Sequence, residues 1–267
     1  MTHFVQPEKI EIDANERAVN EKSPYCFFVC TTFDSFLNDL KEMLQFLRYK
    51  PIWAAFAATL IVGTGSSIAG GAGAYFYTYV LGDMKLMSGV SIIGLIASLV
   101  GIVMGPYLAN RFGKKKVYLT AVIISTALNL LRLLDVTSMI LIYISALIGG
   151  VAGGWMVPVS TSIQADNTTY VQYKTGKRAE AAIASLTSFV SKVAQGLGGA
   201  IPGYVIAAYG FVTGASVQPE SINTGIILCA LILPLIFGIL GSLIFGTQYT
   251  LDQKVVIEMD AKINRNN

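Results

Sequence analysis

Charged residues are scarce in this sequence. Of its 267 residues only 13% are Asp, Glu, Lys or Arg, whereas 54% are hydrophobic. Soluble domains carry about twice this share of charged residues, so most of the chain cannot have an ordinary solvated surface. The net charge of +3 is also too small to indicate a nucleic-acid partner. These shortages favour a protein that lies in a lipid bilayer.

Cysteine and histidine are also rare, with three and one in the whole chain. Cys26 and Cys30 have no second pair or histidine cluster beside them to complete a metal site, so we expect free thiols and no bound metal. The one histidine, His3, lies in a polar segment. None of the common catalytic motifs occurs: HExxH, GxSxG, a Walker loop, or GxGxxG after a strand. We therefore expect no catalytic residues, no cofactor and no enzymatic activity.

The first 50 residues predict two segments. Residues 1–32 are polar and mixed in charge, and they lack the basic-then-apolar order of a cleaved signal peptide, so we expect a polar cytoplasmic segment. Residues 33–50 repeat Phe and Leu at helical spacing between polar residues, which is typical of an amphipathic helix on a bilayer surface. A helix docked on another protein is the alternative.

The region 51–249 contains six apolar stretches, each long enough to cross a bilayer, which takes about 20 residues. They predict an all-α, polytopic membrane protein with six transmembrane helices. Prolines 158, 202 and 234 lie within these stretches, and membrane helices tolerate proline when neighbouring groups satisfy the freed carbonyls. The predicted spans are approximately 52–80, 87–108, 117–134, 138–164, 179–209 and 223–247.

Basic residues concentrate in alternate connections between the predicted spans. The other connections hold only Lys85 and Arg132. Because cytoplasmic loops of membrane proteins are enriched in Lys and Arg, we expect a multi-pass protein of the plasma membrane with both termini in the cytoplasm and residues 250–267 as a cytoplasmic tail. The basic clusters are Lys41, Arg48 and Lys50; Arg111, Lys114, Lys115 and Lys116; Lys174, Lys177 and Arg178; and Lys254, Lys262 and Arg265.

The second connection reads GPYLANRFGKKK over residues 105–116. Gly105 permits close approach of a neighbouring helix, Gly113 permits a tight turn, and Arg111 with the lysines would lie at the anionic inner leaflet. An ordinary basic turn would explain the lysines but not both glycines. The stretch resembles the cytoplasmic loop motif of the major facilitator superfamily, with Asn110 where that motif has an acidic residue.

A longer signature covers residues 166–203. It resembles the glycoside–pentoside–hexuronide:cation symporter family, and the resemblance continues at 48–53, 75–83 and 111–119. It thus covers nearly the whole chain, but only the C-terminal half of the family fold. Thr169 replaces an acidic residue of the pattern. The matching positions include Asp166, Tyr170, Lys174, Gly176, Arg178, Glu180, Ser185, Phe189 and Lys192.

The resemblance implies both a fold and an activity. The fold would be six transmembrane helices in two inverted three-helix repeats, forming one half of a transporter. The activity would be symport of a sugar or glycoside with Na⁺, H⁺ or Li⁺ by alternating access. The resemblance also implies an N-terminal six-helix half as partner, because acidic residues of that half hold most of the coupling cation in this family.

Three interpretations stay open at this point. The chain could pair with a separate N-terminal half and transport. It could be a truncated, non-transporting remnant or assembly partner with the same fold. It could also form a homodimer, which the repulsion between two buried Lys192 side chains disfavours.

Lys192 lies near the middle of the fifth predicted span, where a charged side chain costs roughly 2.5–3.5 kcal/mol on insertion scales. Ser185, Ser188, Lys192 and Gln195 recur at steps of three and four, so they share one helical face and predict the wall of a polar cavity. A lysine that snorkels to the interface is the alternative. The resemblance places a sugar-facing Trp of the family two residues after Trp155, which makes Trp155 a further candidate.

Glycine-rich stretches occur in the first and fourth predicted spans, at 63–73 and 149–154. In the implied repeats these spans are equivalent. The glycines therefore indicate either the moving walls of a substrate cavity or close helix packing through small residues.

Overall fold

The computed structural model describes residues 45–176, 179–212 and 218–266. The predicted polar segment 1–32 and most of the predicted amphipathic helix 33–50 lie outside the described residues. Residues from Phe46 onward belong to a single compact unit.

The described residues are helical, with no strand among them, so the predicted all-α class is confirmed for this part of the chain. The helices follow one another with short connections. Their bounds are α3 Lys50–Tyr75, η1 Phe76–Val80, α4 Lys85–Phe112, α5 Lys114–Arg132, α6 Met139–Thr175, α7 Glu180–Ala208, α8 Ser221–Ile227, η2 Leu228–Ile232, α9 Leu233–Gln248 and α10 Gln253–Asn266.

Four helical segments of the described chain are long and apolar enough to cross a membrane: Lys50–Val80, Lys85–Phe112, Met139–Thr175 and Ser221–Gln248. The two other predicted spans coincide with α5 and α7, which form as helices but are less apolar. Basic residues occupy both ends of α5, and α7 carries Ser, Gln and Lys along its length. The structure therefore supports four of the six predicted spans by length and composition.

Two boundaries differ from the sequence-based expectation. Helix α6 continues to Thr175, well beyond the predicted end at 164, so Asp166 and the residues after it lie on a helix rather than in a loop. The extension is stabilised by packing, because Asp166, Asn167 and Val171 are all buried. The predicted C-terminal tail likewise contains a helix, α10, which contacts α6.

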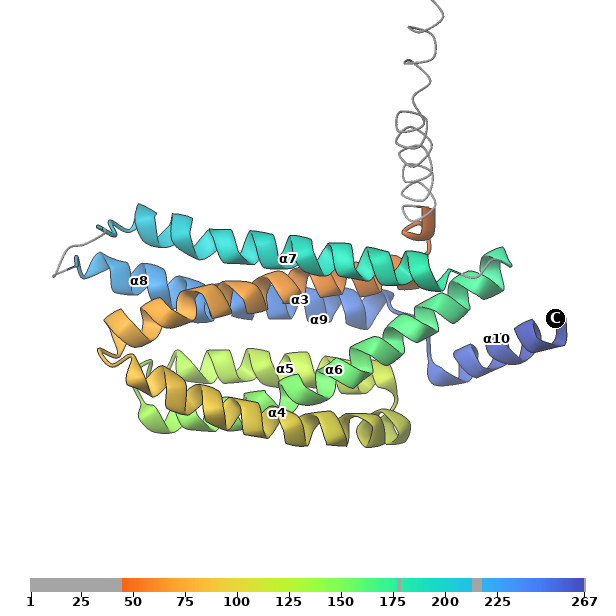
Figure 1. Ribbon diagram of the computed structural model, residues 1–267, viewed down its shortest axis with the longest axis horizontal. Coiled ribbons are helices and arrows are strands. Elements are labelled where there is room, and N and C mark those ends of the chain that lie inside the picture. The colour runs from red at the N-terminus through yellow and green to blue at the C-terminus, as the bar shows by residue number, and fades with distance from the viewer. Residues whose placement is uncertain (1–44, 177–178, 213–217, 267) are drawn as a thin grey trace, which may run out of the picture. The chain divides into compact units, whose positions relative to one another are not determined.

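The long helices are arranged in a reciprocal pattern. Helix α3 packs against α7 and α9, and helix α6 packs against α4 and α5. Figure 1 shows α3, α7, α8 and α9 as one group of neighbouring helices and α4, α5 and α6 as another, with α6 running obliquely across. The first helix of each predicted three-helix repeat thus packs on the second and third helices of the other repeat.

Glycines allow close contact in both helix pairs. A Cβ atom at Gly198 of α7 would lie 2.7 Å from the carbonyl oxygen of Thr64 in α3. A Cβ atom at Gly150 of α6 would lie 2.6 Å from the carbonyl oxygen of Gly94 in α4. Helix pairs in lipid associate largely through such close backbone contact. Gly150 belongs to the glycine-rich stretch 149–154, and for this glycine the structure favours the packing interpretation.

Two helices contain a π-helical turn, in which a backbone amide reaches five residues back. Leu81 N–H donates to the carbonyl of Phe76 at the end of η1, over 3.1 Å. The second such turn, η2, directly precedes Pro234, which has no amide hydrogen to donate within the continuous helical segment Ser221–Gln248.

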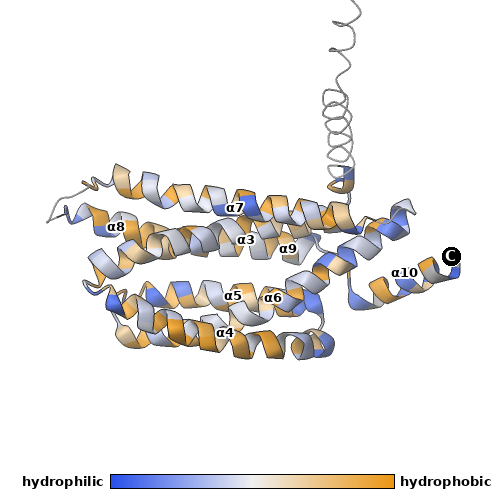
Figure 2. Ribbon diagram, in the orientation of Figure 1, coloured by the Kyte–Doolittle hydropathy of each residue, from blue (hydrophilic) through white to orange (hydrophobic). Residues whose placement is uncertain are grey.

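The outward face of α4 is strongly apolar. Leu95, Val103 and Tyr107 are each at least 63% exposed, although soluble proteins seldom expose so many large apolar side chains together. Figure 2 shows α4 as a nearly continuous hydrophobic ribbon. This composition is that of a helix whose outer face contacts lipid.

Substitution of Gly154 should destabilise the protein, whereas substitution of its neighbour should not. A Cβ atom at Gly154 would collide with the carbonyl oxygen of Ser98 and lie 2.8 Å from the Cα atom of Ser98. A Cβ atom at Gly153 would have no neighbouring atom within 4 Å. We expect Gly154→Ala to lower the free energy of unfolding by about 1–3 kcal/mol. Gly153→Ala should leave it unchanged or raise it by up to about 1 kcal/mol, since alanine favours helix. Thermal unfolding in detergent measures both, and equal effects would contradict the contact.

Candidate functional site

The polar stripe predicted on α7 consists of Ser185, Ser188, Lys192 and Gln195, and the structure places all four on the exposed side of that helix. The opposite side of α7 carries its buried residues, including Ala194 and Gly198, and packs against α3. Figure 2 shows a hydrophilic stretch near the middle of α7, between apolar turns. The stripe is therefore a polar surface on an apolar helix, left open by the other described helices.

Lys192 has no counter-charge within the described part of the chain. The ion pair between Lys114 and Asp166 is the one found among the described residues, and Lys192 does not take part in it. A cation midway along a membrane helix is stable only where it meets water, an anion or a polar ligand. Lys192 is exposed in the structure, so its side chain is accessible to each of these three.

A cavity of about 220 Å³ lies between α3, α6 and α7 and includes the neighbour of Lys192, Ser191. Its polar lining is contributed mainly by α6 and α7. The Asn167 side chain is 2% exposed, and its Oδ1 atom has no hydrogen-bond donor. An acceptor left without a donor in a buried site is available to a hydroxyl group or to water. The polar lining residues are Thr59, Ser160, Thr161, Gln164, Asn167, Thr187 and Ser191.

This cavity was missed by the sequence analysis, although a signal for it exists. Ser160, Gln164 and Asn167 recur at steps of four and three on α6, the same spacing that identified the α7 stripe. They were overlooked because the residues from 165 onward were expected to leave the helix.

Trp155 does not join the α7 stripe. Its backbone lies on the side of α6 that faces α4, where Cβ atoms at Gly101 and Gly105 would meet it at 2.9 and 3.0 Å. The indole packs against a buried cluster, and its Nε1 atom is buried without an acceptor. Val157, two residues later, is 58% exposed.

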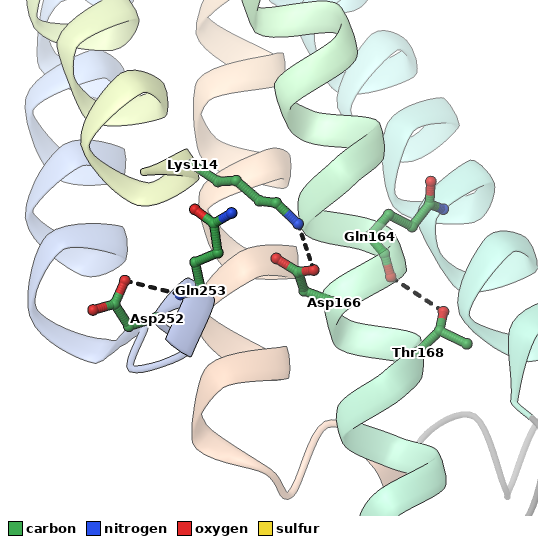
Figure 3. A network of polar contacts seen from close by, with 6 residues as sticks. All are labelled: Lys114, Gln164, Asp166, Thr168, Asp252 and Gln253. Carbon is green, nitrogen blue, oxygen red and sulfur yellow. Dashed lines mark hydrogen bonds and ion pairs between the residues drawn. The ribbon is translucent and has the colours of Figure 1, made fainter. Parts of the chain in front are cut away.

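The motif at 105–116 and the signature at 166–203 meet where α5 begins. Arg132 lies at the other end of α5. Lys114 Nζ at the start of α5 donates to Asp166 Oδ1 on α6 over 2.6 Å, as Figure 3 shows. The side chains are 21% and 8% exposed, so this ion pair is largely shielded from solvent. In the same view the Thr168 hydroxyl donates to the Gln164 backbone carbonyl, and the backbone N–H of Gln253 donates to the Asp252 carboxylate.

The turn between α4 and α5 has the geometry that its glycine predicts. Gly113 has a φ of +88°, a conformation that other residues rarely adopt. Next to it, Lys115 Nζ donates to the Tyr249 carbonyl over 2.6 Å, which fastens the turn to the end of α9. Burial raises the pKa of the Tyr249 phenol above its ordinary value, and the Asp166 carboxylate adds to the rise.

The remaining motif residues have separate positions. Arg111 donates to the Tyr107 hydroxyl over 3.2 Å and is exposed. Lys174 Nζ lies 5.9 Å from the centre of the Tyr170 ring, an arrangement typical of a cation–π contact. Arg178 lies outside the described residues.

Comparison with known proteins identifies the family. Residues 32–253 match the family described as MFS/sugar transport protein. Relatives include the putative sulfoquinovose importer of Escherichia coli strain K12, 24% identical over 85% of this chain and 48% of the relative. They also include the glucuronide carrier protein homolog of the same organism, 28% identical over 80% of this chain and 48% of the relative. The isoprimeverose transporter of Lactiplantibacillus pentosus is 28% identical over 56% of this chain and 31% of its own length.

This chain belongs to the family of MFS/sugar transport proteins, because the family match covers most of it. The relatives named above are described as an importer, a carrier protein homolog and a transporter. The chain spans about half the length of the first two of these relatives.

The Lys114–Asp166 pair should behave as a coupled buried pair. Lys114→Met should lower the free energy of unfolding by about 3 kcal/mol, because it leaves the Asp166 carboxylate buried without its cation. Adding Asp166→Asn to Lys114→Met should recover about 1–3 kcal/mol of that loss. A double-mutant cycle by thermal unfolding in detergent measures the coupling.

Lys116→Met is the matched control for this pair, since Lys116 is exposed on the same turn. It should change the unfolding temperature little. A cycle whose two single effects simply add would show that the pair contributes no coupling energy.

Proposed function

We propose that this chain is the C-terminal half of a secondary active sugar or glycoside:cation symporter that works by alternating access. The exposed polar stripe on α7 carries the proposal. Lys192, Ser188 and Gln195 form a hydrogen-bonding surface on an otherwise apolar helix, and ionisable residues within membrane helices mark substrate and ion pathways. Sugar hydroxyls are suitable partners, because they both donate and accept hydrogen bonds.

The cavity beside the stripe supports the same proposal. Ser191 lines that cavity next to Lys192, so the two polar surfaces adjoin on α7. The buried Asn167 acceptor gives the cavity a site for a hydroxyl donor. A sugar that contacts Lys192 would thus extend toward α6, whose exposed Ser160 and Thr161 also line the cavity.

In this proposal all six long helices cross the bilayer. The reciprocal packing of α3 on α7 and of α6 on α4 supports two inverted three-helix repeats, which in transporters place the binding site at the repeat interface. Both termini would lie in the cytoplasm of a cell whose plasma membrane holds the protein. The Lys114–Asp166 pair then joins the third helix of one repeat to the first helix of the other at the cytoplasmic end.

In this proposal a partner would supply the carboxylates of the cation site and the remaining wall of the sugar site. We infer an N-terminal six-helix half that covers the α7 stripe and supplies acidic residues for Na⁺, H⁺ or Li⁺. A carboxylate of that half would compensate Lys192 and couple cation occupancy to sugar binding through one electrostatic network. The alternative is a truncated, non-transporting remnant or assembly partner with the same fold. This alternative is considered because the chain aligns with only about half the length of these relatives.

Single cysteines should reveal the orientation. Cysteines at Lys116 and Lys174 should be protected from an impermeant thiol reagent outside intact cells, whereas cysteines at Met84 and Glu220 should react. All four positions are exposed in the structure, so differences in labelling report the side of the membrane.

The labelling background should lack Cys26, Cys30 and Cys229. Permeabilised cells are the control, since all four cysteines should react there. Labelling at Lys116 or Lys174 from outside would overturn the assigned orientation.

Transport should require both a partner half and Lys192. The chain alone in vesicles should not accumulate radiolabelled lactose or methyl glucuronide under a Na⁺ or H⁺ gradient. Co-expression with the product of an adjacent reading frame that encodes six helices should give uptake of a glycoside, and Lys192→Ala and Lys192→Arg should each abolish it. A snorkelling lysine would tolerate arginine.

Lys116→Ala is the control for charge and expression, and it should retain uptake. Gradient-driven uptake by the purified chain alone would contradict the requirement for a partner. Full uptake with Lys192→Ala at normal expression would contradict the role of Lys192. Insertion without uptake in every combination would favour the remnant.

A further inference from the structure

A second polar cavity, of about 200 Å³, contains the side chain of Arg132 at the end of α5. We call this cavity the Arg132 pocket. Its walls come from η1, α4, α5 and α6. It lies at the opposite end of α5 from Lys114, and none of the α7 stripe residues lines it. It is therefore separate from the proposed sugar surface.

Arg132 has a charge that the described residues do not neutralise. Its Nε atom is buried and has no acceptor, and its Cζ atom lies 5.1 Å from the centre of the Phe76 ring. The described residues that line the pocket include no Asp or Glu. A guanidinium group stays protonated in proteins, so the pocket holds a permanent positive charge.

The acidic residues of the two adjoining connections are bound to their own turns. Asp83 accepts a hydrogen bond from the Lys85 amide over 2.8 Å. Asp135 accepts from both the amide and the hydroxyl of Thr137, over 3.1 and 3.0 Å. Neither carboxylate forms an ion pair with Arg132. No carboxylate of the described residues therefore balances the Arg132 charge.

The other polar groups of the pocket can all donate hydrogen bonds. They are the Tyr77, Ser125 and Ser145 hydroxyls and the Asn129 amide. Ser145 Oγ is buried and has no partner. The described residues of the pocket thus present hydroxyls, an amide and one guanidinium, and no lining carboxylate. These groups together suit an anion.

One cation among apolar walls favours a monovalent anion. Leu128 and Ile142 line the same pocket. In such apolar surroundings a buried charge is most stable when an ion of equal and opposite charge lies beside it. A divalent phosphate or sulfate would leave a net negative charge there. The volume suits a halide with a few waters, at about 30 Å³ of liquid volume for each water.

The π-helical turn η1 gives the pocket its shape. Phe76 and Tyr77 begin this turn, so one ring lies against the Arg132 guanidinium and the next residue lines the pocket. Such turns inside α-helices are frequent at functional sites. We propose that the Arg132 pocket binds a small monovalent inorganic anion of the halide class, with Arg132 as its counter-charge.

Chloride binding to the purified chain in detergent tests the proposal. Replacing sodium gluconate by sodium chloride keeps Na⁺ and ionic strength constant, so a cation effect is excluded. We expect a saturable rise in unfolding temperature, of roughly 3 °C at ten times the dissociation constant. Equilibrium dialysis with ³⁶Cl⁻ should find one bound ion per chain.

Arg132→Gln should abolish both the saturable rise and the bound ³⁶Cl⁻. Arg111→Gln is the matched control, because Arg111 is an exposed arginine at the other end of the helices, and this variant should bind chloride as the unsubstituted chain does. Ser145→Ala, which removes one donor and leaves the charge, should weaken binding several-fold. This smaller change keeps the test decisive if Arg132→Gln fails to fold.

Absence of saturable ³⁶Cl⁻ binding to the folded chain would overturn the proposal and leave a water-filled pocket. Equal binding by the Arg132→Gln and unsubstituted chains would also overturn it. The assay needs neither sugar nor a partner half, so its result is independent of the transport experiments.

Discussion

The structure depends on close backbone contact between helices at glycine. In lipid, an apolar helix gains little by covering apolar surface, so helix pairs are held by packing and by hydrogen bonds. Here Gly198 brings α7 against α3, and Gly150 and Gly154 bring α6 against α4. These contacts fix which face of α7 is covered, and hence which face presents Lys192. The polar stripe is a consequence of how the opposite side of the helix packs.

Three cations of the long helices differ in their surroundings. Lys114 is paired inside the chain with Asp166, and the pair connects α5 to α6. Arg132 lies among hydrogen-bond donors inside the bundle, and Lys192 faces outward without a carboxylate among the described residues. Buried charges seldom persist without compensation. The Lys114–Asp166 pair therefore stabilises the fold, whereas Lys192 and Arg132 are the cations on which the two binding proposals rest.

The sequence predicted the helices well because apolar runs and glycine spacing are local signals. The period of Ser185, Ser188, Lys192 and Gln195 predicted one shared face of α7, and all four are exposed, but their role as a cavity wall stays a prediction. It did not predict that α6 continues past 164, because burial of Asp166 and Asn167 depends on α5 and α3, which are distant in sequence. The Arg132 pocket was equally inaccessible, since Tyr77, Asn129 and Ser145 come from three helices. Helix α10 was missed because a polar amphipathic segment resembles a tail until α6 covers its apolar side.

The π-helical turns have an evolutionary consequence. A π-helical turn holds one residue more than an α-helical turn needs, so loss of one residue within Phe76–Val80 would restore α-helical hydrogen bonding without breaking the helix. Every residue beyond the deletion would then rotate by about 100° around the axis. Tyr77 and the connection to α4 would be redirected while the glycine contacts of α3 stayed in place. Insertion or deletion of a single residue at η1 or η2 can thus change which side chains face the interior at one end of the helix. The packing at the other end stays unchanged.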